Sequence, residues 1–387
     1  MNYDLSAREI LDVLVSFPTV SSDTNLPLVE FVEGYFTHHG IESFRIMSPC
    51  GNKAGLVAQV GPDVAGGVVL SAHTDVVPVT GQEWSTDPWT VHEKDHRVYG
   101  RGTCDMKGFV AQAMVAMVNA KDRPLKRPLQ IAFSRDEEVG LLGAADVAEA
   151  LLTNFKKADA VIVGEPTNME VVTGHKSCDE ITVSIRGYEV HSSRVHEGVP
   201  AIMYGAQLIN WIVDQNEQAQ NAAPTDIAAL YDPPFTTMHV GQISGGTANN
   251  ITSKECHFAI DLRCVGDEHT EDWIAKIQAE ADRLQDQMQS VHPDTYFKID
   301  PGVGPGVRPT PNNKAEELAR RVTGDNAQRT VAYGTDGGHF QLAGFDVVIC
   351  GPGDIAQAHQ PDEFLELSEF SACAEFLQKV IAQLEIE

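Results

Sequence analysis

Histidines and carboxylates stand where several apolar segments of this sequence end. His73 and Asp75 close the run VVLSAHTD, and Glu165 closes the run VIVGE. His359 comes shortly after a further apolar run at 346–351. The carboxyl ends of parallel strands meet at one edge of an open sheet, where ligands commonly bind. Because imidazole and carboxylate groups are typical ligands of zinc, the sequence predicts a metal site at such an edge.

Two loops add further carboxylates to this set. Asp105 lies in YGRGTCDMKGF, a glycine-flanked loop that leads into a predicted helix. Asp136, Glu137 and Glu138 are consecutive in SRDEEVG, directly after an apolar run, and their mutual repulsion opposes burial unless a cation compensates it. Two histidines, a bridging aspartate and two glutamates would complete two open zinc sites, whose metals lie about 3.5–4 Å apart and share a water. One glutamate would be left over as a base.

Each of these residues also has an ordinary structural explanation when it is taken alone. His73 would be a structural histidine at a strand end, and Asp105 would cap the N-terminus of the following helix by accepting backbone N–H groups. The three consecutive acids would form a solvated loop. The prediction of a metal site therefore depends on the whole set, because suitable side chains recur at nearly every strand end.

The segments that must position these side chains alternate between strand and helix patterns. This alternation predicts a mostly parallel sheet that helices cover on both faces, in an α/β fold. The predicted strands are 66–75, 128–134, 159–165 and 346–351, and the predicted helices are 6–18, 27–40, 109–120, 141–152 and 367–385.

The pattern changes near residue 175. The next segments indicate a strand, a helix, a pair of antiparallel strands and a charged helix, at 180–190, 199–213, 236–246 with 256–265, and 270–289. They make a compact α+β unit of about 110 residues, the size of a small domain. We therefore predict a catalytic domain in two segments, 1–175 and 290–387, which an inserted domain interrupts at 176–289.

Composition excludes some classes of function. The 387 residues favour two domains, and the net charge of −27 disfavours nucleic acid and anionic membranes as partners, because both bind clustered Lys and Arg. The N-terminus has no basic segment followed by an apolar run, and no window approaches the ~20 apolar residues of a spanning helix. The seven cysteines contain no C-x-x-C pair, which is typical of reduced thiols. We expect a cytoplasmic protein.

The motifs HTDVVP, GRGTCDMKG, DEEVG, GEPT and AHQPDE, in this order, resemble those of the di-zinc aminoacylase and carboxypeptidase-G type metallohydrolases. The resemblance covers essentially the whole chain and includes an inserted, ferredoxin-like α+β lid domain where the sequence predicts an insertion. It implies two divalent metal ions, Zn²⁺ or Co²⁺, held by five side chains: His73, Asp105, Glu138, Glu165 and His359. Asp105 would bridge both metals, with His73 and Glu165 at one of them.

The resemblance also implies roles for residues beside the metals. Asp75 would hydrogen-bond His73 and hold its ring, and Glu137 would be the general base. The segment RGYEVHSSRVHEG is similar to the family's G-x-x-x-H-S-S segment. His191 would then stabilise the oxyanion, commonly across the interface of a homodimer, whereas a surface-loop histidine is the alternative. Arg194 stands near the place where the family often has proline.

Two further segments resemble the substrate-binding regions of the family. GGTANNITSKECHFAIDLR makes Arg263 a candidate for bidentate carboxylate binding, with Asn249 or, preferably, Asn250 beside it. The alternative is an arginine on a strand surface that pairs with a nearby acid. YGTDGGHF makes Asp336 a candidate partner for a substrate ammonium group, while His339 departs from the small or apolar residue expected there.

The ending GPGDIAQAHQPDEF is particularly similar to that of family members that deacetylate acetylornithine. The resemblance thus implies hydrolysis of N-acetyl-L-ornithine to L-ornithine and acetate, as in arginine biosynthesis. Alternatives within the family are a succinyl-diaminopimelate desuccinylase, an aminoacylase or a dipeptidase. A desuccinylase needs a further basic contact for its second carboxylate, and no unassigned arginine obviously supplies one. A non-catalytic metal-binding scaffold is the alternative of another class, although here every expected ligand and the base are present.

Overall fold

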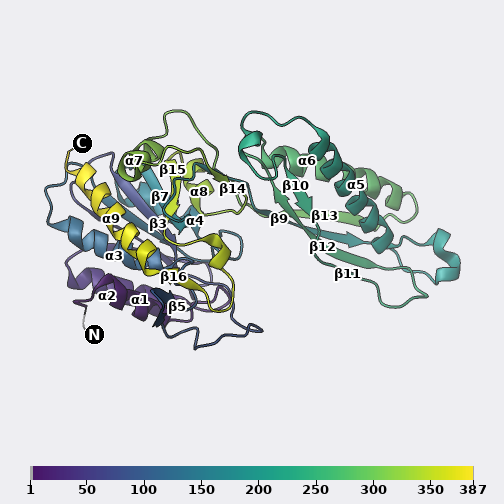
Figure 1. Cartoon of the computed structure of the whole chain (residues 1–387). Helices are drawn as coiled ribbons and strands as arrows, with labels where there is room; N and C mark the ends of the chain where they lie inside the picture. The colour runs from purple at the N-terminus through teal and green to yellow at the C-terminus, as the bar shows by residue number, and fades with distance from the viewer. Residues whose placement is uncertain (1–2, 387) are drawn as a thin grey trace. The chain divides into compact units, whose positions relative to one another are not determined.

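The computed structural model describes residues 3–386, and the chain divides into two compact units (Figure 1). The first unit takes the chain up to Gly174, then Pro309–Arg329, and then the chain from Thr335 onwards. The second unit takes His175–Arg308 and Thr330–Gly334. Each unit has its own hydrophobic core.

The first unit is built on a six-stranded sheet in the order β1-β2-β6-β3-β7-β15. The last four strands of this order run parallel, whereas β1 and β2 are antiparallel to their neighbours. Every residue of β3 and β6 is buried, as expected of a parallel sheet covered on both faces. The strands are β1 (Ser43–Met47), β2 (Ala54–Val60), β3 (Val68–His73), β6 (Leu129–Ser134), β7 (Ala160–Pro166) and β15 (Asp346–Gly351).

Helices cover both faces of this sheet. Side chains of α1 (Ala7–Val15), α2 (Leu26–His38), α3 (Lys107–Lys121), α7 (Lys314–Thr323) and α9 (Leu367–Leu384) form one core with alternate residues of the strands. Helices α4 (Ala144–Asn154) and α8 (Gly337–Leu342) contact the strands outside that core. Figure 1 shows β3 and β7 between these two groups of helices. The predicted α/β fold with its mostly parallel sheet is confirmed, and no helix within 3–386 is long and apolar enough to cross a membrane.

A small three-stranded sheet joins segments that are far apart in the sequence. It has the order β16-β5-β4, with β4 (His92–Lys94), β5 (Arg97–Tyr99) and β16 (Phe364–Glu366). Phe364 pairs with Tyr99, and the N–H of Gly100 donates to the carbonyl of Glu363 at 3.0 Å. This pairing brings the segment that follows His359 beside the loop that carries Asp105.

The second unit contains an antiparallel sheet and two long helices. The sheet has the order β10-β12-β9-β13, and β11 also pairs with β12. Strand β9 alternates buried and exposed residues, and its buried side packs against α5 and α6. The elements are β9 (Asp179–Arg186), α5 (Ala201–Asn221), β10 (Thr237–His239), β11 (Ile243–Gly245), β12 (Glu255–Arg263), α6 (Thr270–Gln289) and β13 (Tyr296–Pro301). Because β13 pairs with β9, this unit extends to Arg308, past residue 289, where the sequence analysis ended the insertion.

Short elements complete the chain. Strands β8 (Gly174–His175) and β14 (Thr330–Val331) form a two-stranded ladder. Short 3₁₀ segments lie at Ser192–Glu197, Ala228–Leu230 and Ile355–Gln357, and the first of these is kinked at Arg194. The third of these turns lies between β15 and His359.

Gly164 tests how closely α3 packs on the central sheet. A Cβ at this position of β7 would overlap the ring of Phe109, the buried aromatic residue of α3. We expect Gly164→Ala to lower the free energy of unfolding by about 1–3 kcal/mol, as overpacked core substitutions do. Urea unfolding measures the change. Gly241→Ala is the control, because the nearest atom to its added Cβ lies at 3.4 Å. Equal stability of the two variants would contradict the close packing of α3 on β7.

Candidate metal centre

Strand ends in the first unit bring the candidate ligands together. His73 is the last residue of β3 and pairs in register with Ser134, the last residue of β6. Glu137 and Glu138 lie three and four residues after the end of β6, and Glu165 is the penultimate residue of β7. These three strands are parallel neighbours, so their side chains meet at the same edge of the sheet.

Asp105 lies between the two histidines of the predicted ligand set. Its Oδ1 lies 2.9 Å from Nε2 of His73, and its Oδ2 lies 3.4 Å from Nε2 of His359. On one side, Nε2 of His73 is also 3.6 Å from Oε1 of Glu165. On the other side, Nε2 of His359 is 3.0 Å from Oε2 of Glu138. A carboxylate whose two oxygens face two separate groups of donors has the arrangement of a bridging ligand.

The donor set fits a pair of divalent cations. Among the described residues, Oε1 of Glu138 and Oε1 of Glu165 are buried and have no hydrogen-bond partner. Such atoms are costly to bury unless another group compensates them. Nitrogen and oxygen ligand atoms of His73, Asp105 and Glu138 lie within 4.8 Å of one another, as do those of His73, Glu137 and Glu165. Cations within this set would compensate both unpartnered oxygens.

The pKa values of the same side chains point to missing positive charge. Burial and nearby carboxylates raise the pKa of Glu137 and of Glu165 well above the ordinary value. Hydrogen bonds to Asp105 and Glu138 raise the pKa of His359 to about 10. Burial opposes charge on His73, yet Glu165 and Asp105 outweigh it and raise the His73 pKa. Without metal, protons must therefore balance the carboxylates, and metal binding would release them.

Asp75 supports the centre in a way that differs from the sequence-based expectation. Nδ1 of His73 lies 2.9 Å from the main-chain carbonyl oxygen of Asp75, while the Asp75 carboxylate is 3.7 Å from it. The carboxylate instead accepts the hydroxyl of Ser21 at 2.6 Å and the backbone N–H groups of Glu137 and Glu138 at 3.2 and 3.4 Å. These donors compete for the carboxylate, so the imidazole is held by the backbone of Asp75.

Glu363 is a positioning residue that the sequence analysis missed. Its fully buried carboxylate accepts the backbone N–H groups of Gly102, Cys104 and Asp105 at 2.9–3.0 Å and the guanidinium of Arg101 at 2.8 Å. Because one carboxylate accepts from four donors, it holds in place the loop that carries Asp105, the candidate bridging ligand. The available signal was an arginine and a glutamate inside the motifs GRGTCD and HQPDE that had no assigned role.

The same network reaches the backbone of His359. The guanidinium of Arg101 donates to Oε1 of Gln82 at 2.5 Å, and Nε2 of Gln82 donates to the carbonyl of His359 at 2.7 Å. Arg101 is 1% exposed, so its charge acts on protein groups and not on solvent, and its guanidinium also lies 5.1 Å from the ring centroid of Trp84. Arg101, Gln82 and Glu363 thus tie together the two segments that supply Asp105 and His359.

The second unit carries three further candidates. His191 is exposed, and its Nδ1 contacts the hydroxyl of Ser193 at 2.8 Å. The loop of His191 pairs with the loop of Asn250, because the N–H of Ser192 donates to the Asn250 carbonyl at 2.8 Å. Arg263 donates through Nε to the carboxylate of Asp261 at 3.0 and 3.2 Å, as in the structural alternative. Substrate contacts of these residues stay predictions.

Asp336 and His339 lie on the first unit, at α8. Asp336 is buried, accepts the hydroxyl of Ser134, and has its pKa raised to about 6 by burial. Ser134 is the last residue of β6, so this contact places Asp336 next to the end of that strand. His339 is partly buried on the same helix. The contact of Asp336 with a substrate ammonium group stays a prediction.

The contacts of Glu363 lead to a test of its positioning role. Glu363→Gln keeps the size of the side chain but leaves one acceptor oxygen for four donors. We expect metal affinity to fall about 10- to 100-fold, the usual effect of losing a group that supports metal ligands. Competition with a chromophoric chelator measures the affinity, and excess metal should restore activity. Glu366→Gln, which breaks the half-buried ion pair with Arg97 at 2.7 Å, is the control. Unchanged affinity in Glu363→Gln would contradict the role.

Comparison with known proteins identifies the family. Residues 69–383 match the model of peptidase family M20/M25/M40. The chain is 32% identical to an acetylornithine deacetylase of Myxococcus xanthus, with 97% of this chain and 96% of the relative covered. It is 29% identical to one of Salmonella heidelberg (strain SL476), with 96% of each covered. A metallo-carboxypeptidase of Sulfolobus solfataricus shares the fold, with a TM-score of 0.77, 17% identity, and 98% and 99% coverage. The chain belongs to peptidase family M20/M25/M40 and is a metal-dependent hydrolase.

Proposed function

We propose that this hydrolase cleaves the amide bond of an N-acyl amino acid, with N-acetyl-L-ornithine as its main substrate and L-ornithine and acetate as products. The position of Asp105 between two histidine-containing groups, with Glu137 beside them, is the observation that carries the chemistry. The two acetylornithine deacetylases that align with nearly the whole chain support the choice of substrate. All seven cysteines are free thiols, which supports a reducing compartment such as the cytoplasm.

Five side chains would hold two divalent metal ions, namely His73, Asp105, Glu138, Glu165 and His359. When bound, such a pair lowers the pKa of a shared water and polarises a carbonyl oxygen. Zn²⁺ and Co²⁺ both accept these nitrogen and oxygen ligands. Asp75 would keep His73 and the Glu137–Glu138 backbone in place while substrate is bound.

Glu137 is the proposed general base. It takes a proton from the water as the water oxygen attacks the acyl carbonyl carbon. It then gives that proton to the amide nitrogen as the C–N bond breaks, so acetate and the free amine leave. Burial and neighbouring carboxylates raise the pKa of the Glu137 carboxyl, and cations in the centre would lower that pKa again, so the group is suited both to accept and to release the proton.

Residues outside the metal-ligand set are proposed to recognise the rest of the substrate. Arg263 is the proposed partner of the α-carboxylate, which would take the place of Asp261. Asn250 would donate to the same carboxylate, and Asp336 of the first unit would meet the side-chain ammonium. His191 would stabilise the oxyanion, supplied by the second subunit of a homodimer. Its exposure and its contact with Ser193 keep one ring nitrogen available to a ligand.

The paired glutamates provide a direct test of the mechanism. We expect Glu137→Gln to keep its metal content and to lose activity by a factor of about 10²–10⁴, the usual contribution of a general base. Glu138→Gln is the matched control, because it should lose metal. Elemental analysis and steady-state kinetics separate the two effects. Near-normal turnover in Glu137→Gln would show that another group takes the proton.

A substrate panel tests the specificity. With the metal-loaded enzyme, we expect kcat/KM for N-acetyl-L-ornithine to exceed that for N-succinyl-diaminopimelate, other N-acetyl amino acids and dipeptides by about tenfold or more, as for sites with dedicated charged contacts. Ninhydrin detection of released amine measures all of them. A preference for the succinyl substrate or a dipeptide would replace the proposed specificity but keep the mechanism. No hydrolysis of any substrate would favour a metal-binding scaffold.

A further inference from the structure

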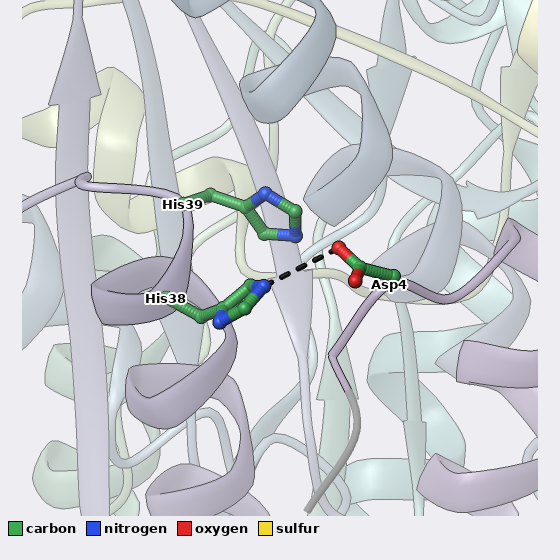
Figure 2. A group of neighbouring side chains, drawn as sticks. All are labelled: Asp4, His38 and His39. Atoms are coloured by element: carbon green, nitrogen blue, oxygen red, sulfur yellow. Dashed lines mark hydrogen bonds and ion pairs between the residues drawn. The ribbon is translucent and has the colours of Figure 1, made fainter.

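We propose that Asp4, His38 and His39 form a separate transition-metal site at the surface of the first unit. His38 ends α2, His39 follows it, and Asp4 lies in the segment before α1. Figure 2 shows the two imidazole rings with a nitrogen each directed towards the carboxylate of Asp4. The site shares no residue with the strand-end centre.

The spacing of these groups matches a metal ion. Nε2 of His38 lies 3.3 Å from Oδ1 of Asp4, and one ligand atom from each of the three residues lies within 4.8 Å of the others. Ligands at about 2.0–2.1 Å from a tetrahedral zinc are about 3.3–3.4 Å apart. The His38–Asp4 pair already has this separation, and a His39 nitrogen lies within 4.8 Å of both ligand atoms.

Aromatic contacts orient the two imidazoles. The His39 ring lies 4.6 Å from the buried Tyr35 ring in an edge-to-face contact, and the His38 ring lies 5.7 Å from the Tyr3 ring. Nε2 of His39 is 3.2 Å from the carbonyl oxygen of Tyr3, which is a possible fourth ligand. Rings held by such contacts lose less conformational freedom when a metal binds than free surface side chains do.

An ordinary ion pair explains this arrangement less well. His38 and Asp4 are 44% and 77% exposed, and an exposed pair of this kind contributes little stability. It also leaves out the second imidazole, whose Nε2 contacts the Tyr3 carbonyl oxygen, although all three side chains place a ligand atom within 4.8 Å of one another. Two imidazoles with one carboxylate suit Zn²⁺, Ni²⁺ and Cu²⁺. A bound ion would join the segment before α1 to the end of α2.

Zinc titration of the full-length, chelator-treated protein tests this site. We expect the wild type to bind one Zn²⁺ more per chain than His38→Gln/His39→Gln, as measured by calorimetry or equilibrium dialysis. Asp4→Asn should weaken that additional ion about tenfold, the size of effect that losing a carboxylate has on metal sites. Because the result is a difference between variants, it does not depend on the activity or on the occupancy of the strand-end centre.

A second double variant controls for the loss of two histidines. His196 and His257 are exposed and lie 3.4 and 3.8 Å from the carboxylates of Glu197 and Glu255. His196→Gln/His257→Gln should bind as much zinc as the wild type. Equal zinc binding by the His38/His39 variant and the wild type would overturn the proposal. An unchanged affinity in Asp4→Asn would remove the carboxylate from the site and overturn the three-ligand arrangement.

Discussion

Four carboxylates at one sheet edge impose the constraint on which this structure depends. The four are Asp105, Glu137, Glu138 and Glu165, and all are largely shielded from solvent. Burial and the neighbouring carboxylates raise the pKa values of the three glutamates, whereas two histidines lower the pKa of Asp105. Like charges at such separations cannot all ionise without nearby positive charge. Cations relieve this repulsion most directly, so folding of the first unit is coupled to the binding of metal ions.

The architecture meets this constraint by fixing the backbones that carry these carboxylates. The parallel strands β3 and β6 end in register, and β3 pairs with β7 up to two residues before His73 and Glu165, which brings these strand ends to one edge. Arg101 is fully buried nearby, but its charge pairs with Glu363. A buried pair of this kind contributes little net stability because of desolvation, but it fixes geometry when its other hydrogen bonds are also satisfied. Here the three backbone N–H groups satisfy the remaining acceptor positions of Glu363, whereas Nε of Arg101 has no hydrogen-bond partner within residues 3–386.

The main strands and the candidate ligands could be predicted from the sequence, whereas the places of some shorter or distant elements could not. Apolar runs such as those ending at His73 and Glu165 have clear lengths and boundaries, so the strands and the residues at their ends were predictable. The place of β13 in the second unit was not, because it depends on pairing with β9 more than a hundred residues earlier. Strands of three residues, such as β5 and β16, show no period, so Glu363 could not be linked to the Asp105 loop from sequence.

The proposed division of roles between Glu137, as the base, and Glu138, as a metal ligand, is a matter of backbone geometry. Asp75 accepts both of their N–H groups, one on each carboxylate oxygen, and so fixes the turn after β6. With that turn fixed, Glu138 reaches His359, whereas Glu137 groups with His73 and Glu165. Their chemistry is identical, and their order in the sequence alone does not say which one meets a metal. The carboxylate of Asp75 is therefore more valuable as an anchor for this turn than as a partner for the His73 ring, which its own main-chain carbonyl already holds.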